Sequence, residues 1–318
     1  MRTRLSTAVL AVAVVFSAMP LASCRQIAGL KAKMAFKDAN VAYQASDYRK
    51  AAAKYEEALS RDPNFTDAYF YLANSYDNLF KPAKKGDATN DAFLTKAIEN
   101  YKKASEQSAN PKLKKLALEY LVAAYRDKLN DPGQAEPVVQ RMIQMEPNEP
   151  TNYFALAKIY EDAGRYDEAE AMLQKAKEIH PNDPTVYMQL AGYYNRQGEF
   201  DKTIDALQQR AAKEPTNPEA FHTLATYFWD KTFRDKSLKD PDKLKYIQTG
   251  LEAEDKAIQL KPDYMEALVY KGLLLRLQAT IEKDANKQKA LLKEADELRD
   301  KAQAIRKTKT GGAGASAG

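Results

Sequence analysis

The residues that could carry out chemistry in this chain are few and far apart. The sequence contains two histidines, His180 and His222, and a single cysteine, Cys24. Neither histidine has a second histidine or a cysteine at metal-ligand spacing, so we predict no metal site and no catalytic base there. No glycine-rich phosphate loop and no nucleophile elbow occur in the sequence. We therefore expect a binding protein without a cofactor, not an enzyme.

The balance of charges argues against a nucleic-acid partner. The chain has 49 Lys and Arg against 44 Asp and Glu, a net charge of +5 spread over 318 residues. No dense basic stripe alternates with aromatic residues, as nucleic-acid binding requires. Acidic residues alternate with lysines, as expected of solvated helix faces, so we expect no small-molecule substrate either. The hydrophobic content of 44% is ample for a core.

The N-terminus has the features of an export signal. Arg2 and Arg4 precede an apolar run over residues 5–19, which is short for a membrane span. The run ends in Leu-Ala-Ser-Cys at residues 21–24, which resembles the lipobox of bacterial lipoproteins. That resemblance implies a signal peptide over residues 1–23, cleavage before Cys24 and lipid attachment to its thiol. An ordinary secretory signal with an incidental cysteine is the alternative.

The same resemblance gives a location. Arg25, in place of aspartate after the cysteine, implies an outer-membrane lipoprotein that faces the periplasm. Only a few residues separate Cys24 from the first helical pattern near Ala28, and such a tether reaches about 15–25 Å. Lys31, Lys33 and Lys37 then lie near the lipid headgroups, or form a solvated basic face.

The rest of the chain is organised by a repeat. Prolines recur near the ends of helical segments, and three of them are spaced 34 residues apart; the set is Pro63, Pro111, Pro147, Pro181, Pro215 and Pro262. A fixed period with the apolar content of two short helices marks a unit that cannot bury its own apolar face. Such a unit must pack against its neighbours.

The fourth repeat is the clearest. Its first helix carries apolar residues at i, i+3, i+4 and i+7, Gly164 supplies a turn, and a second helix follows, with the residues Tyr153, Leu156, Ala157, Tyr160, Tyr166, Ala169, Leu173 and Ala176. This pattern resembles the tetratricopeptide repeat, over about residues 28–307. The resemblance implies an all-α, right-handed superhelical solenoid of about seven helix pairs. We therefore assign residues 24–310 to the solenoid and expect residues 311–318, rich in Gly and Ala, to be disordered.

Several repeats depart from the pattern. Insertions interrupt it over residues 80–93 and 231–243, either as a functional face or as passive loops. Pro132 and Pro137 in the third repeat predict that its second helix begins late, near Glu136. In the first repeat, Ala35 and Asp38 replace large apolar residues, which suits an end position. The final helix carries a narrow apolar seam, as expected of a cap facing water.

In tetratricopeptide arrays the first helix of each repeat lines the concave face. Mapping the family's positions gives a predicted peptide-binding groove of Phe70, Tyr71, Asn74, Tyr120, Phe154, Lys158, Met188, Gln189, Asn195, His222, Thr226, Trp229, Val269 and Tyr270. The carboxylate clamp of one family subset is missing, because Phe36 and Phe70 stand where it has lysine. An aromatic groove suits an apolar or amphipathic segment. Some of these rings can instead pack between helices.

Together these patterns predict a lipid-anchored scaffold that binds a protein or peptide through its concave face. Its role would be in the assembly or organisation of the cell envelope, as in the lipoproteins that assist pilus assembly. Two alternatives remain: an enzyme, or the recruitment subunit of one, acting on envelope polymers, and a self-associating structural unit. Converging carboxylates in a deep pocket would favour the enzyme.

Overall fold

A computed structural model describes the backbone of residues 26–314 and the side chains of residues 26–308. Within these residues all regular structure is helical, as predicted. The predicted signal peptide over residues 1–23 and the lipidation residue Cys24 lie outside the described residues. Both stay predictions.

The described helices follow one another as seven pairs, which confirms the predicted number of repeats. The first helix covers residues 26–44. The next six α-helices are α2 (Tyr48–Arg61), α3 (Ala68–Leu79), α4 (Ala88–Gln107), α5 (Pro111–Ala123), α6 (Pro132–Met145) and α7 (Pro150–Asp162). After these come α8 (Tyr166–Ile179), α9 (Pro184–Arg196), α10 (Phe200–Lys213), α11 (Pro218–Arg234), α12 (Asp240–Leu260), α13 (Met265–Ile281) and α14 (Ala285–Gly314).

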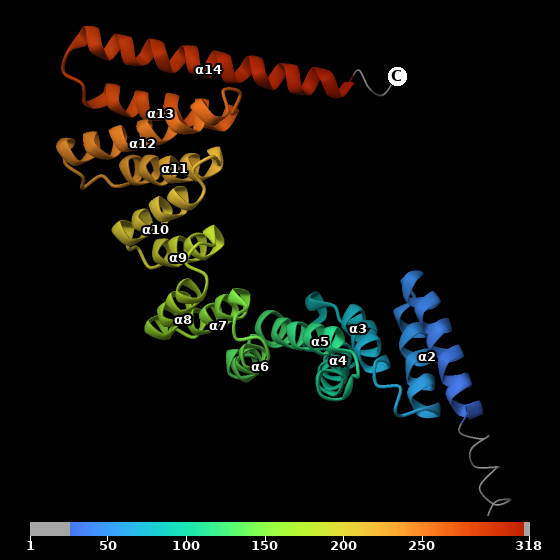
Figure 1. The fold of residues 1–318 in the computed structure, drawn as a ribbon. Helices are drawn as coiled ribbons and strands as arrows, with labels where there is room; N and C mark the ends of the chain where they lie inside the picture. The colour runs from blue at the N-terminus through green and yellow to red at the C-terminus, as the bar shows by residue number, and fades with distance from the viewer. Residues whose placement is uncertain (1–25, 315–318) are drawn as a thin grey trace, which may run out of the picture. The chain divides into compact units, whose positions relative to one another are not determined.

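The chain divides into two compact units, with the division inside α8. Unit 1 extends to Ala169 and unit 2 begins at Glu170. In each unit successive helix pairs stack side by side, as the coloured ribbon in Figure 1 shows. Each unit is described by itself below.

The first helix of a pair commonly begins at a proline. Pro111, Pro150, Pro184 and Pro218 each occupy the first turn of their helix, and the residue before each accepts a backbone hydrogen bond through its side chain. Proline suits this position because its missing N–H is one that the helix leaves unpaired in any case. Pro111 therefore opens α5, and our reading of it as a helix-ending proline is wrong.

The turns inside four of the pairs share one backbone conformation. Ser46, Asn130, Gly164 and Gly198 all have positive φ, at 59°, 58°, 72° and 77°. The residue after Ser46, Gly164 and Gly198 donates its N–H to a carbonyl five positions earlier, as from Arg165 to Tyr160 at 2.8 Å. After Asn130, Asp131 donates instead to the carbonyl of Tyr125, six positions earlier. This is the left-handed turn that ends many helices. The predicted role of Gly164 and Gly198 as turn residues is confirmed, and Ser46 and Asn130 fill the same role without being glycine.

The core is built from small residues at points where helices approach closely. Ala157, Ala169 and Ala176 are buried, as the repeat pattern requires. Gly250 occupies in the sixth repeat the position that Ala169 occupies in the fourth. A Cβ added at Gly250 would lie 3.1 Å from Leu274 Cδ1 and 3.3 Å from Phe228 Cβ. This position thus brings α12 against both α11 and α13.

The third repeat differs from the prediction. Helix α6 begins at Pro132, one turn before Glu136, and Pro137 lies inside it. Proline at this early place removes only the hydrogen bond to the carbonyl of Gly133, which is exposed to water. Before α6, helix α5 continues into a π-helical turn, η2 (Ala124–Leu129), that ends at Asn130.

The two predicted insertions are partly helical. Residues 80–93 form a loop with a short 3₁₀ turn, η1 (Pro82–Lys84), and the start of α4. Buried Asn90 holds the loop, because its amide accepts from Lys81 N at 2.8 Å and donates to the Lys81 and Lys84 carbonyls. The second insertion lengthens α11 and α12. Helix α14 includes residues 311–314, the start of the predicted tail; residues 315–318 lie outside the described residues, so the disorder of the tail stays a prediction.

Candidate functional site

Five rings in unit 2 form a continuous row, which we call the aromatic ladder: Tyr264, His222, Tyr270, Trp229 and Phe233. Successive ring centroids lie 5.1, 5.2, 5.4 and 5.1 Å apart. Trp229 and Phe233 are stacked at 9°, whereas the other pairs meet edge to face. These are the favoured geometries of aromatic pairs, so the row is a fixed surface.

Two helices position the ladder. His222, Trp229 and Phe233 lie on α11 at intervals of seven and four residues, so they share one face with Thr226. Tyr270 lies on α13, and Tyr264 directly precedes that helix. The face is open to water at one end, because Phe233 is 48% exposed. Val269 of the predicted groove lies on α13 and is 41% exposed. Four residues of the predicted groove, His222, Trp229, Thr226 and Tyr270, are thus brought together.

A buried acid lies beneath the ladder. Glu254 of α12 is fully buried, and its Oε1 lies 2.9 Å from Nδ1 of His222. Its second oxygen, Oε2, has no hydrogen-bond partner among the described residues. Burial is the main cause that raises the pKa of Glu254, and Asp255 raises it as well, whereas the hydrogen bond with His222 lowers it. The balance of these causes places the pKa of Glu254 at about 7. The carboxyl under the ladder therefore changes its charge near neutral pH.

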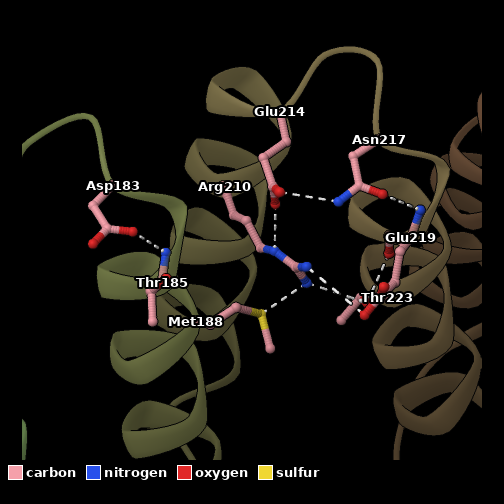
Figure 2. Close-up of polar contacts among 8 residues, drawn as sticks. All are labelled: Asp183, Thr185, Met188, Arg210, Glu214, Asn217, Glu219 and Thr223. Carbon is pink, nitrogen blue, oxygen red and sulfur yellow. Dashed lines mark hydrogen bonds and ion pairs between the residues drawn. The ribbon is translucent and has the colours of Figure 1, made fainter.

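A buried arginine stands between α9, α10 and α11 (Figure 2). Arg210 Nε donates to Glu214 Oε2 at 2.8 Å, and Nη1 lies 2.9 Å from Met188 Sδ and 3.4 Å from Thr223 Oγ1. Its Nη2 lies 3.9 Å from the exposed carboxylate of Glu219. Only 8% of this residue is exposed. The Nη1 donor of Arg210 thus faces two uncharged acceptors, the sulfur of Met188 and the hydroxyl of Thr223, whereas a guanidinium group binds oxyanions more strongly.

The same cluster fixes the start of α11. Glu214 Oε1 accepts from Asn217 Nδ2 at 2.9 Å, and Asn217 Oδ1 accepts from Glu219 N at 3.0 Å (Figure 2). The side chain that binds Arg210 is therefore linked to the N-cap of α11. Because His222, Trp229 and Phe233 of the aromatic ladder lie on this helix, the Arg210 cluster contributes to fixing these three rings relative to α10.

In unit 1 the predicted groove residues Phe70, Tyr71, Asn74 and Tyr120 belong to a polar cluster and an aromatic cluster. The Tyr43 hydroxyl of the first helix donates to Asn74 Oδ1 at 2.8 Å and accepts from Asn78 Nδ2 at 3.3 Å. The ring centroid of Phe70 lies 5.4 Å from that of Tyr71 and 5.8 Å from that of Tyr120. Phe70 is buried, whereas Tyr120 is 38% exposed. Phe70 accordingly packs between helices, the alternative that the sequence had left open, and Tyr120 provides surface.

The remaining predicted residues make smaller contributions. Phe154 on α7 is half-buried, and Lys158 forms an ion pair with Asp162 of the same helix. On α9, Met188 contacts Arg210, while Gln189 and Asn195 are exposed. These residues do not join the ladder. Whether they contact a partner stays a prediction.

Two charged residues were missed by the mapping, and both occupy places where the repeat has an apolar residue. Arg210 lies five residues before Pro215, and the residue five positions before Pro181 is Ala176. Glu254 lies eight residues before Pro262, and at the same distance before Pro181 and Pro215 the chain has Leu173 and Leu207. A charged residue at a repeat position that is normally apolar and buried was therefore the feature of the sequence that could have indicated both residues. Phe233 and Tyr264 had no such signal, because one lies in an insertion and the other before a helix.

Neither metal ligation nor membrane crossing has structural support in the described part of the chain. Over residues 26–308, no group of three or more His, Cys, Asp or Glu side chains is arranged to hold a metal ion. Among the described helices, none combines the length and the apolar content that a bilayer span requires.

Stacked helix pairs with a 34-residue period define a helical-repeat protein, a class whose repeats present extended binding surfaces. Comparison with known families agrees. Models of the tetratricopeptide repeat match residues 36–79 and 128–193. The chain thus contains tetratricopeptide repeats over these residues, and proteins with such repeats generally bind protein partners. No curated protein matches the sequence.

Three solved structures are similar to the chain, and the first of them shares its fold. The C-terminal part of a repeat-containing protein from Cytophaga hutchinsonii has a TM-score of 0.56 and 18% identity, with 85% of this chain and 98% of that chain covered. A tetratricopeptide repeat protein from Parabacteroides merdae ATCC 43184 has a TM-score of 0.47 and 14% identity, covering 84% and 99%. MamA from Desulfovibrio magneticus RS-1, residues 41 to its end, has a TM-score of 0.41 and 17% identity, covering 61% and 96%.

Proposed function

We propose that this protein is a scaffold that binds an apolar or amphipathic protein segment along the aromatic ladder of unit 2. The observation that carries the proposal is the continuous row of five rings on α11, on α13 and directly before α13, with its end ring Phe233 exposed. Aromatic side chains provide large contact area at a low cost in conformational entropy, and they dominate the energetics of protein interfaces.

The rigidity of the ladder supports this role. Each ring is held by its neighbours, and His222 is held in addition by Glu254 from below. A partner would therefore meet a surface whose side chains are already ordered, and the entropic cost of binding would be reduced. A helix laid along α11 and α13, with apolar residues at intervals of three and four, fits such a row.

We also propose that the protein acts at the cell envelope, attached through a lipid on Cys24 and facing the periplasm. The N-terminal Arg2 and Arg4, the apolar run and the Leu-Ala-Ser-Cys sequence support this proposal. Several acyl chains give stable anchoring, because a single chain binds a membrane only marginally. A scaffold held in this way would recruit its partner close to the bilayer, in envelope assembly or organisation.

The binding test uses the single tryptophan, Trp229, as an internal probe, since it lies within the ladder. Peptides selected from a random library against the chain are titrated while Trp229 fluorescence is recorded. We expect Phe233→Ala to weaken binding about tenfold, because hot-spot aromatics contribute more than 1 kcal/mol. Leu292→Ala, which alters an exposed apolar residue of α14 in the same unit, is the control. Equal binding by both variants would contradict a ladder site.

The anchoring test compares wild type with Cys24→Ser in fractionated bacterial cells. Wild type is expected in the membrane fraction and to incorporate labelled fatty acid. The variant is expected to lose the label, because serine offers no thiol for the lipid. A wild-type chain without lipid label would contradict the anchor and leave the ladder unaffected.

A further inference from the structure

The first helix of unit 1 carries an exposed apolar stripe, defined as Ile27, Leu30, Met34 and Val41. Their exposed fractions are 54%, 62%, 60% and 60%. The intervals of three, four and seven residues place all four on one face of the helix. Large apolar side chains scattered singly on a surface need no explanation, but four aligned on one helix form a patch.

The stripe is not the face that packs in the core. Ala32, Ala35, Ala39 and Ala42 are buried and occupy the opposite side of the helix, about 130° away around its axis. This alanine face allows close approach to neighbouring helices, and Phe36 beside it contacts the rings of Tyr55, Phe65 and Tyr71. The helix is therefore apolar on two faces, of which unit 1 covers only one.

Charged residues border the stripe on both sides. Lys33 and Lys37 flank one edge, and Lys31 and Asp38 flank the other; all four are exposed. Lysines beside an apolar stripe can extend their ammonium groups to lipid phosphates while their stems lie on the apolar boundary. The excess of lysine is complementary to an anionic bilayer surface.

The position of the stripe in the chain says where it would meet lipid. Ile27 lies three residues after Cys24. If Cys24 carries the lipid proposed above, the start of the stripe is held within about 10 Å of the anchored residue. A helix tethered so closely has its exposed face at the level of the headgroups.

We propose that the first helix lies in the membrane interface, with Ile27, Leu30, Met34 and Val41 against the lipid. The stripe adds a second attachment to the lipid anchor and orients unit 1 on the bilayer. The placement rests on the proposed envelope location, whereas the affinity of the stripe for lipid is a property of the helix itself. It can therefore be measured without the anchor.

The experiment uses residues 24–318 with Cys24→Ser, a chain that contains every described residue and has no lipid. Co-sedimentation is measured with vesicles of phosphatidylethanolamine and phosphatidylglycerol at 7:3, and with vesicles of phosphatidylcholine alone. We expect binding to the anionic vesicles, weaker binding to the neutral ones, and about tenfold weaker binding to the anionic vesicles by Met34→Glu. Met145→Glu is the matched control, because Met145 is an exposed methionine on α6 of the same unit.

Circular dichroism confirms that both variants are folded, and sedimentation equilibrium without vesicles gives the oligomeric state. Loss of vesicle binding in Met34→Glu but not in Met145→Glu supports the proposal. Wild-type chain that does not bind vesicles overturns it, and so does equal binding by both variants. A dimer that Met34→Glu dissociates, in a chain without vesicle binding, would assign the stripe to a second copy. Peptide binding at Phe233 is unaffected by any of these outcomes.

Discussion

Glu254 shows how one substitution in a repeat alters its chemistry. At a place where other repeats bury leucine, this chain buries a carboxyl group against His222. Titratable groups face it from α11, through His222, and from its own helix, through Asp255, and Tyr264 lies near it as well. A buried carboxylate with one oxygen unpaired is costly, so the protonated form is favoured in the folded chain.

The consequence is a predicted pH dependence of stability. The pKa of Glu254 rises from 4.5 to about 7 on folding, so between these pH values the folded chain holds a proton that the unfolded chain releases. Stability is therefore highest below pH 4.5 as far as this group is concerned, and falls as the pH rises to about 7. The loss is on the order of 3 kcal/mol.

We expect Glu254→Gln to flatten this profile, because glutamine keeps the hydrogen-bonding shape without titrating. Urea unfolding monitored by Trp229 fluorescence at pH 5, 6, 7 and 8 measures the free energy of unfolding of unit 2. Glu252→Gln, an exposed position on the same helix, serves as the control and should keep the wild-type slope. A wild-type chain that becomes more stable between pH 5 and 7 would show that the sign is wrong.

At the scale of the element, the turns inside four of the pairs share a residue in the left-handed conformation but not its sequence identity. Asn130, Gly164 and Gly198 recur at the 34-residue period, and Ser46 has the same left-handed conformation. The backbone geometry is imposed by the two helices that the turn joins, because their packing fixes where the chain must reverse. Glycine adopts this conformation without strain, whereas serine does so at a cost of about 1–2 kcal/mol.

Ser46→Gly is therefore expected to stabilise unit 1 by about 0.5–1 kcal/mol, since relief of strain exceeds the entropy that glycine adds to the unfolded chain. Thermal unfolding followed by circular dichroism measures the change. Ser60→Gly is the opposite control, because Ser60 lies inside α2, where glycine should destabilise by a similar amount. If both variants were destabilised, the strain assigned to Ser46 would not exist.

At the scale of the whole molecule, a repeat protein needs an end that does not expose its core. Helix α14 supplies one for unit 2, because Ala295 and Ala302 are buried while most of its other side chains are exposed. Its approach to α13 is close, since a Cβ added at Gly272 would lie 3.3 Å from the Ala295 carbonyl oxygen. The seam predicted for the final helix is thus present at these two alanines.

Removal of α14, by ending the chain at Asp284, is expected to expose the apolar side of α13 and destabilise unit 2. Terminal repeats with a polar outer face are required for solubility in proteins of this type. Urea unfolding monitored by Trp229 should show a lower midpoint, and binding of a hydrophobic dye should increase. An unchanged midpoint would mean that α14 does not contribute to the core.

The sequence by itself determined the all-α fold, the seven helix pairs and the repeat period. These follow from apolar spacing along each helix and from glycine and proline at helix ends, which are local signals. Even so, Pro111 was assigned wrongly, because a proline at a helix start resembles one that follows a helix end. The start of α6 was placed too late, because Pro137 was expected at a helix start but lies inside the helix. The family pattern also assigned His222, Trp229 and Tyr270 to one groove, and the structure brings these three rings into contact.

Only the tertiary structure decided which of these faces meet. Phe233 and Tyr264 complete the ladder, Glu254 reaches His222 from another helix, and Phe70 is buried between helices. Spacing along one helix fixes the direction of a side chain, but the distance to the next helix depends on how small residues such as Gly250 allow two helices to pack. That distance is set by all the contacts of a unit at once, and no single segment of sequence contains it.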